Sequence, residues 1–178
     1  PTNHSALDTD VIYTGYQATA FNMVANITGG EKIYDGQPIE PTITIMDESG
    51  NVRTDWERYV IVTVSNGTSF HLDEHASCNA IDYGTYTVTL SLDMNRINAD
   101  GAKILGFAAN SVTEANLIVR SRPLDLVSTN NNRIYNGTSV AKIDNITIQP
   151  YSQTADASGI VPGDNVALNS TTAYGYYS

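Results

Sequence analysis

The side chains that could carry chemistry are few, and their spacing fits no catalytic arrangement. Cys78 lies near His71 and His75 in the sequence, but a lone cysteine is more often a small buried side chain than a nucleophile. The His71–His75 spacing would suit a metal ion on a helix, whereas the neighbouring residues have the pattern of a strand or loop. The acidic pairs at 47–48 and 73–74 are adjacent residues, which point apart on a strand and do not face each other as glycosidase carboxylates do. We therefore predict that the chain is not an enzyme and has no catalytic residue.

One loop carries four oxygen-bearing side chains that could bind calcium. Asp47, Ser49, Asn51 and Asp55 have the alternating spacing of the first half of a calcium-binding loop. Arg58 stands where such a loop places its bidentate glutamate, and the glycine comes too early. A plain hairpin turn is the preferred interpretation and calcium the alternative; no other metal or cofactor is expected.

The composition excludes several classes of partner. The 178 residues include 19 acidic and nine basic side chains, giving a net charge of −10. Nine scattered cations do not form the basic surface that binds nucleic acid or an anionic membrane, and no apolar run is long enough to span a bilayer. With 20 Thr, 17 Asn, 14 Ser and a single cysteine, the chain has the composition of a bacterial cell-surface protein rather than a disulfide-rich secreted domain. It has no signal segment, so we expect it to be part of a larger protein.

A repeated pentapeptide is the clearest internal signal. Residues 32–36 read Lys-Ile-Tyr-Asp-Gly, and residues 133–137 read Arg-Ile-Tyr-Asn-Gly. Asp-Gly and Asn-Gly favour a tight turn in which the glycine adopts a positive φ, and a repeat at this distance suggests tandem modules. We interpret six residues as structural turn positions: Tyr34, Asp35, Gly36, Tyr135, Asn136 and Gly137.

The hydrophobic pattern predicts a mostly β protein of the β-rich α+β type. Alternating apolar residues at 42–45, 59–65, 86–92 and 115–120 indicate antiparallel strands with one buried face. Spacings of three and four between 95 and 107 predict one short helix, with Asn98 as its N-cap and Gly106 as its end. Arg122-Pro123 marks a boundary, because proline interrupts a sheet. The resulting division is an unassigned β segment at 1–22, a first module at 23–122 and a second at 123–178.

Several of these residues resemble a known family. They are the 32–36 motif followed by Pro38 and Pro41, the strand at 84–91, the short helix, and the strand that ends before Arg122-Pro123. Together they resemble the MBG module of Gram-positive surface adhesins, especially the mucus-binding repeat proteins of lactobacilli. The second module is similar to the related YDG repeats, with Asn136 in place of the usual Asp, and lacks a recognisable ending. The resemblance implies tandem, small β-grasp-like or related sheet modules.

The resemblance also implies a function. It predicts a non-catalytic repeat fragment of a bacterial cell-surface adhesin, anchored to the cell wall elsewhere in the parent protein, which binds mucus, host glycoconjugates or an extracellular host protein. The alternative is a stalk module that only projects an adhesive tip, with a rigid junction at Arg122-Pro123. Neighbouring repeats would be further partners. The sequence identifies no ligand-binding residue. A Lys–Asn isopeptide crosslink is not expected, because Lys32 opens the turn motif and should face solvent.

Overall fold

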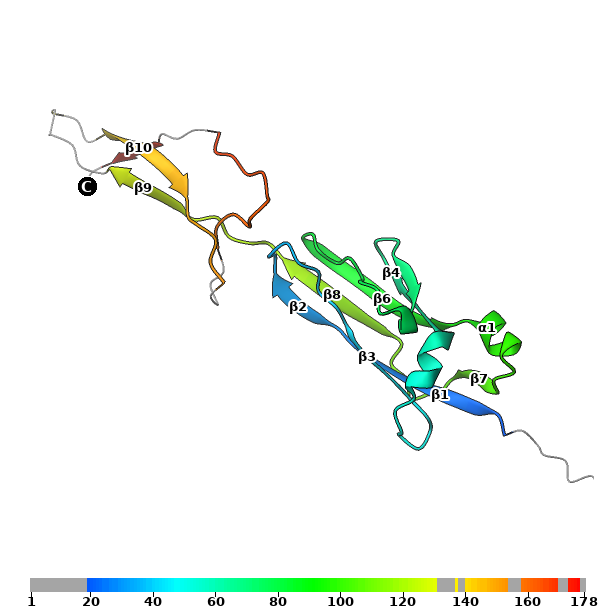
Figure 1. The fold of residues 1–178 in the computed structure, drawn as a ribbon. Helices are drawn as coiled ribbons and strands as arrows, with labels where there is room; N and C mark the ends of the chain where they lie inside the picture. Colours follow the sequence, from blue (N-terminus) through cyan, green and yellow to red (C-terminus); the bar gives the residue numbers. More distant parts are fainter. Residues whose placement is uncertain (1–18, 131–136, 138–139, 154–157, 170–172, 177–178) are drawn as a thin grey trace, which may run out of the picture.

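The protein is mostly β-strand and contains one short α-helix, as the sequence predicts. The computed structural model describes residues 19–130, 137, 140–153, 158–169 and 173–176. Residues 19–121 form a part with a hydrophobic core, called here the core-bearing part. The described residues from Pro123 to Tyr176 form the C-terminal part, which continues beyond one end of the core-bearing part (Figure 1). No helix among the described residues is long and apolar enough to cross a membrane.

The larger sheet of the core-bearing part has five strands in the order β2 (Gly30–Ile33), β8 (Glu114–Arg120), β6 (Gly84–Leu92), β4 (Val60–Val64) and β5 (Ser69–His71). Only β2 and β8 are parallel to each other; the other pairs are antiparallel. The alternation predicted in β6 is confirmed, because Val88 and Leu90 are buried while Thr89 and Ser91 are exposed. One face of this sheet therefore covers the core and the other carries hydroxyl groups.

A second sheet covers the opposite side of the core. It consists of β3 (Thr42–Met46), β1 (Phe21–Thr28) and β7 (Ile104–Phe107), with β1 antiparallel to β3 and parallel to β7. Met23, Ala25 and Ile45 from this sheet belong to the same buried cluster as Val62 and Leu117 from the larger sheet. Burying apolar faces from both sheets against each other is the main stabilising contribution to this part.

The chain passes from one sheet to the other at Gly29. β1 lies parallel to β7, and β2 lies parallel to β8, so residues 21–33 follow residues 104–120 along their length. At the crossing, a Cβ atom on Gly29 would lie 1.9 Å from the carbonyl oxygen of Asn116. Only glycine fits there, because the two backbones approach closer than any side chain permits.

The helix begins earlier than the sequence predicts. α1 spans Met94–Ala99, and its N-cap is Asp93, whose side chain accepts a hydrogen bond of 3.1 Å from the Arg96 backbone N–H. The predicted helix with Asn98 as N-cap and Gly106 as its end is wrong, because residues 104–107 form β7 and pair with β1. Gly101, with φ of 66°, turns the chain after α1. Sheet pairing thus overrides the weak helical spacing.

Two short 3₁₀ helices close the open side of the core. η1 spans Thr54–Tyr59 and buries Trp56 and Tyr59, and η2 spans Leu72–Glu74. The two are in contact with each other. They fill the space beside β4 and β5.

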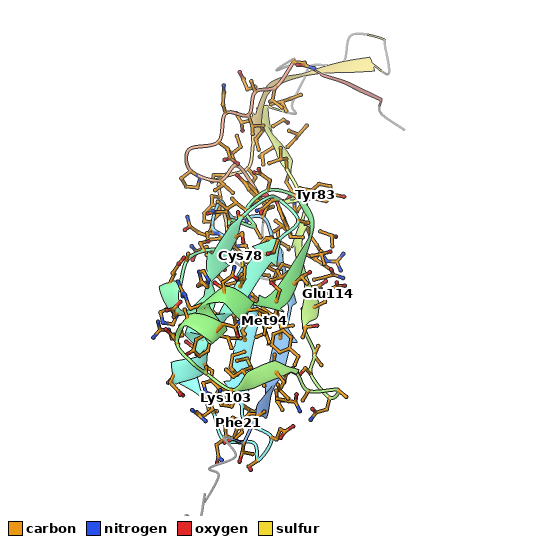
Figure 2. The ribbon with its side chains drawn as sticks, turned by 90° about the vertical axis from the view of Figure 1, so that its right-hand side faces the viewer. Phe21, Cys78, Tyr83, Met94, Lys103 and Glu114 are labelled. Carbon is orange, nitrogen blue, oxygen red and sulfur yellow. The ribbon has the colours of Figure 1, made fainter. Side chains whose placement is uncertain are left out.

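The C-terminal part contains a three-stranded antiparallel sheet. Its order is β11 (Ala173–Tyr176), β10 (Val140–Ile148) and β9 (Leu126–Asn130). Between Gln149 and Asn169 the described residues contain no strand, and they run back toward the core-bearing part (Figure 1). Figure 2, which looks along a different direction, places Tyr83 at the end of the core-bearing part nearest this sheet and Phe21 at the far end.

Candidate functional site

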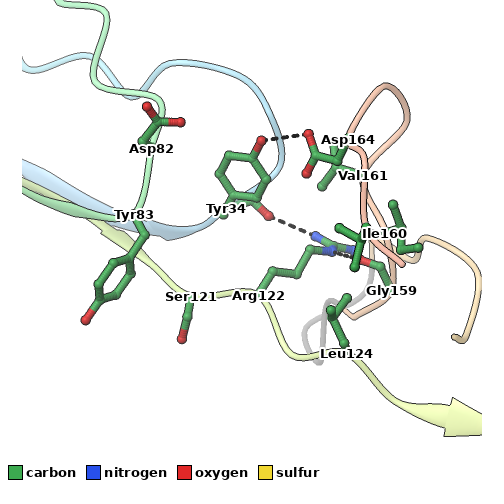
Figure 3. Close-up of a pocket in the computed structure, with 11 residues that line it drawn as sticks. Tyr34, Asp82, Tyr83, Ser121, Arg122, Leu124, Gly159, Ile160, Val161 and Asp164 are labelled. Carbon is green, nitrogen blue, oxygen red and sulfur yellow. Dashed lines mark hydrogen bonds between the residues drawn. The ribbon is translucent and has the colours of Figure 1, made fainter. Parts of the chain in front are cut away.

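The best-defined polar site lies where the core-bearing and C-terminal parts meet, and Arg122 is at its centre. Its guanidinium donates hydrogen bonds to the backbone oxygens of Gly159 (2.9 Å), Tyr34 (3.1 Å), Ser158 (2.8 Å) and Ser152. An arginine side chain has five N–H donors in a fixed plane and always carries its charge. Arg122 therefore holds one carbonyl of the core-bearing part and three of the C-terminal part at once. Figure 3 shows its contacts with Tyr34 and Gly159.

An aromatic ring covers the arginine. The guanidinium carbon of Arg122 lies 4.4 Å from the centre of the Tyr151 ring. Such a cation–π contact adds roughly 0.5–2 kcal/mol, depending on how far solvent is excluded. It also fixes the plane in which Arg122 meets its four acceptors.

A second polar contact crosses the junction. The Tyr34 hydroxyl donates to Asp164 Oδ1 at 2.9 Å (Figure 3). This hydrogen bond, together with burial and the nearby carboxylates of Asp164, Asp82 and Asp35, raises the pKa of Tyr34. The Tyr34 backbone N–H donates to the Arg120 oxygen at 2.9 Å, so the residue is fixed to β8 on one side and to the C-terminal part on the other.

The turn motif at 32–36 positions Tyr34. Lys32 Nζ lies 2.5 Å from Asp35 Oδ1 and also donates to the Pro38 oxygen. Burial raises the pKa of Asp35, but the hydrogen bonds from Lys32 and from the Gln37 backbone N–H outweigh it and hold that pKa below its usual value. Lys32 does not face solvent as predicted, because its side chain is only 21% exposed and closes the turn through this ion pair.

Two glycines bring the chain segments of the junction together. Gly36 has φ of 76°, as the motif predicts, and a Cβ there would lie 3.0 Å from Val161 Cγ1 of the C-terminal part. Gly159 has φ of 85°, and a Cβ there would lie 2.4 Å from the Gln149 and Pro150 oxygens. Ser158, Gly159 and Val161 are buried. The junction is thus packed as well as hydrogen-bonded.

Two grooves flank the contact between Tyr34 and Asp164. One, of about 310 Å³, is lined by Asp82, Tyr83, Arg122 and Leu124 among others. The other, of about 400 Å³, is lined by residues that include Gln37, Tyr151 and Gln153. Tyr83 is 74% exposed and turns away from Tyr34 (Figure 3). Aromatic faces beside amide and carboxylate groups can bind a polar ring such as a sugar.

Two of the four calcium candidates, Asp47 and Asp55, have hydrogen-bond or ion-pair partners within their own loop. Asp47 Oδ1 accepts hydrogen bonds from the backbone N–H groups of Ser49 and Asn51, both at 2.9 Å, and Asp55 pairs with Arg53 at 2.5 Å. These are the contacts of a hairpin turn between β3 and η1. In the described part of the chain, no group of three or more His, Cys, Asp and Glu side chains could hold a metal ion. Calcium binding at this loop stays an untested prediction.

The second copy of the motif lies mostly outside the described residues. Tyr135 and Asn136 are not described, and Gly137 is exposed with φ of 84°, the turn conformation that the motif predicts. The equivalence of the two copies is therefore not tested, whereas Tyr34, Asp35 and Gly36 all lie at the junction.

The remaining candidates for chemistry are His71, His75 and Cys78, of which the last two line one groove. His71 Nε2 lies 3.0 Å from Asp93 Oδ2 and its Nδ1 3.4 Å from Glu74 Oε1, while His75 is exposed. Cys78 is buried, as expected of a lone cysteine. Burial, and then hydrogen bonding to Glu40, raise the pKa of its thiol to about 12, so it stays protonated.

Sequence reasoning missed most of the junction. It marked Arg122-Pro123 as a boundary and as the rigid junction of a stalk, and it gave no role to Tyr151 or Gly159. The arginine binds backbone carbonyls, which every residue carries, so no partner residue type could signal the contact. The available signal was an arginine at the end of a strand directly before a proline.

Comparison with protein families identifies the core-bearing part. The family model of the MBG domain matches residues 22–119, which is more than half of the chain. The chain belongs to the MBG domain family. The resemblance of the sequence to an MBG module is thereby confirmed. No curated protein and no solved structure matches the chain.

The MBG match extends from β1 into β8 and ends just before the junction. It includes the whole 32–36 motif, so Tyr34 and Gly36 belong to the MBG domain. Their partners Asp164 and Val161 belong to the C-terminal part, for which the relation to YDG repeats stays a prediction. Membership of the MBG family is consistent with a repeat module of the surface-adhesin type.

Proposed function

We propose that this chain is a non-catalytic stalk segment of a bacterial cell-surface adhesin, which holds successive modules in line and projects a binding tip from the cell wall. The observation that carries the proposal is the Arg122 junction. A linker without contacts would allow the two parts to move independently. Here one partly buried arginine binds carbonyls of both parts, and a hydroxyl–carboxylate bond crosses beside it.

The shape of the molecule also supports a projecting role. The C-terminal sheet lies beyond the end of the β2–β8–β6 strands rather than against their face (Figure 1). This arrangement adds length for each module, and the −10 charge keeps neighbouring chains apart. Neighbouring repeats of the parent protein would extend the array on either side.

Small-angle X-ray scattering of Arg122→Ala tests the proposal. We expect the wild-type chain to scatter as one extended particle, and the variant to give a broader distance distribution because its two parts move independently. Arg120→Ala is the matched control, because Arg120 is two residues earlier and its side chain forms an exposed ion pair with Glu31, away from the junction contacts. If the distance distribution of the wild type is as broad as that of Arg122→Ala, the proposal of a rigid stalk is contradicted.

Glycan binding is the second candidate, and the groove beside Tyr83 favours it. Tyr83 and Asp82 come from the core-bearing part, and Leu124 and Asp164 from the C-terminal part, so the junction itself would form the site. Its ligand would be mucin, a host glycoconjugate or a glycosylated host protein. Because a single shallow groove binds weakly, repeats along the parent chain would supply avidity.

A mucin and glycan array with a multimerised fragment tests this second function. Tyr83→Ala should reduce the signal several-fold, whereas Phe21→Ala, which removes an exposed aromatic ring at the opposite end, should leave it unchanged. Absence of any signal from the multimer leaves the stalk as the whole function.

A further inference from the structure

A groove away from the junction has the features of a separate binding site. It measures about 420 Å³ and shares no lining residue with the two junction grooves. Its apolar floor consists of Ile43, Phe70 and Leu72, which are partly buried against the core. The walls are the residues before β3, η1, and the loop that follows η2. Grooves that combine an apolar surface with a few polar groups are where ligands bind.

Two glutamates line the groove, and in the part of the chain that the structure describes only one of them accepts a hydrogen bond. Glu40 accepts hydrogen bonds from the Ser77 hydroxyl at 2.5 Å and from the Cys78 backbone N–H at 3.0 Å. Glu57, on η1, is partly buried. Among the residues that the structure describes, none donates a hydrogen bond to its carboxylate or forms an ion pair with it. A carboxylate beside an apolar surface is poorly solvated, so it is stabilised when a cation binds.

The groove wall formed by the loop after η2 is held in one conformation. His75 and Asn79 have φ of 50° and 51°, which is uncommon for residues other than glycine. Asn66 Nδ2 donates to the backbone oxygens of Cys78 and Asn79 at 3.0 and 3.2 Å. Together with the Glu40 contacts, these bonds fix the loop between the two strained residues. A preformed groove loses less conformational entropy on ligand binding than a groove that must first become ordered.

We propose that this groove binds a basic side chain of a partner protein, with its apolar stem over Ile43, Phe70 and Leu72 and its charged head at Glu57. Lysine and arginine have this combination of methylene stem and cationic head. The charge of −10 attracts a basic segment. The same charge opposes phosphate and carboxylate ligands. This surface is distinct from the junction, and the proposal does not rest on the stalk function.

Titration of the full chain with short peptides tests the proposal. The peptide is acetyl-Leu-Lys-Leu-amide, and its binding is monitored in ¹H–¹⁵N correlation spectra of the protein at pH 7.5 and low salt. We expect saturable shifts, with an affinity on the order of millimolar, at the backbone amides of Ala76, Ser77 and Cys78. Because exposed charge pairs are screened, added salt should weaken binding. The analogue with norleucine in place of lysine keeps the stem without the charge and should bind several-fold more weakly.

Protein variants provide the second readout. Glu57→Gln should weaken binding of the lysine peptide at least about threefold, which is the effect of losing one partly screened charge pair. Glu114→Gln removes the same charge from a residue that does not line the groove, and it should bind as the wild type does. Equal binding of the lysine and norleucine peptides, equal binding by Glu57→Gln, or shifts confined to other residues would overturn the proposal. The peptide series on the wild-type chain decides the question even where Glu57→Gln alters stability.

Discussion

Arg122 contributes to the structure in a way that its residue type alone does not indicate. Its four acceptors are backbone oxygens from three separate segments of the chain. Lysine would carry the same charge at this position but cannot supply several donors in one plane or stack as well on Tyr151. The geometry of the guanidinium, more than its charge, therefore sets how the two parts meet.

Substitution of Gly36 can separate two contributions of the 32–36 motif to stability, the turn conformation and the packing at the junction. Gly36→Ala should lower the free energy of unfolding by about 1–2 kcal/mol, because alanine is strained at this positive φ. The new Cβ would also lie 3.0 Å from Val161, which should lower the free energy of unfolding further. Gly50→Ala is the control, because Gly50 has φ of 85° and open space around it. Urea denaturation measures both variants. Equal losses would show that the contact with Val161 contributes nothing.

Asp35 makes the contribution of the 32–36 motif to stability dependent on pH. Its pKa is lowered in the folded protein, so its contribution to stability is present above the unfolded-state pKa of about 3.9. That contribution is lost as the pH falls through the lower, folded-state pKa. Asp35→Asn should therefore be less stable than the wild type at pH 7 and lose less stability on acidification to pH 3. Urea denaturation at the two pH values checks this, and an equal loss of stability on acidification in the two proteins would contradict it.

Among the elements, α1 shows how a capping residue fixes the start of a helix. Asp93 caps α1 through the Arg96 N–H, and it also accepts from His71. Asn98, which the sequence favours as a cap, lies inside the helix. The short helix depends on this cap and on burial of Ile97, because six residues are too few to form a stable helix alone.

Substitution at these two positions tests where the helix begins. Asp93→Ala should lower Tm by several degrees, since it removes both the cap and the partner of His71. Asn98→Ala should leave Tm nearly unchanged, because alanine is a good helix former and no cap is lost. Differential scanning calorimetry measures both. A larger effect at Asn98 would favour the later start of the helix.

The crossing between the two sheets at Gly29 is a second element-scale feature. Gly29→Ala should destabilise the protein by more than about 2 kcal/mol, because its Cβ would overlap the Asn116 oxygen unless β1 and β8 separate. Gly106→Ala, in β7, has nothing within 4 Å of its Cβ and should be close to neutral. Thermal unfolding of the two variants measures the contrast, and a neutral Gly29→Ala would mean that the crossing can relax.

At the scale of the whole molecule, the junction determines whether the core-bearing part and the C-terminal part keep a fixed relative orientation. Limited proteolysis reports how often it opens, because cleavage needs an extended, accessible chain. Arg122→Ala should be cleaved between residues 121 and 126 several-fold faster than the wild type, while Arg120→Ala should resemble the wild type. If cleavage is equally fast in all three proteins, the junction is open in solution and the stalk proposal fails at this point.

The sequence by itself determined the mostly β class, the buried faces of strands such as β6, the positive φ of Gly36 and membership of the MBG family. These depend on local properties, because a period of two and an Asp-Gly turn act over a few residues. Only the tertiary structure decided the start of α1, the ion pair of Lys32 with Asp35, the place of Glu57 in a groove and the partners of Arg122. The partners of Arg122 come from segments far apart in the chain, and backbone carbonyls carry no residue-type signal that would mark them in advance. The Lys32–Asp35 and Asp93–Arg96 contacts are local, but the sequence offers competing local arrangements, and the packing of the surrounding strands selects among them.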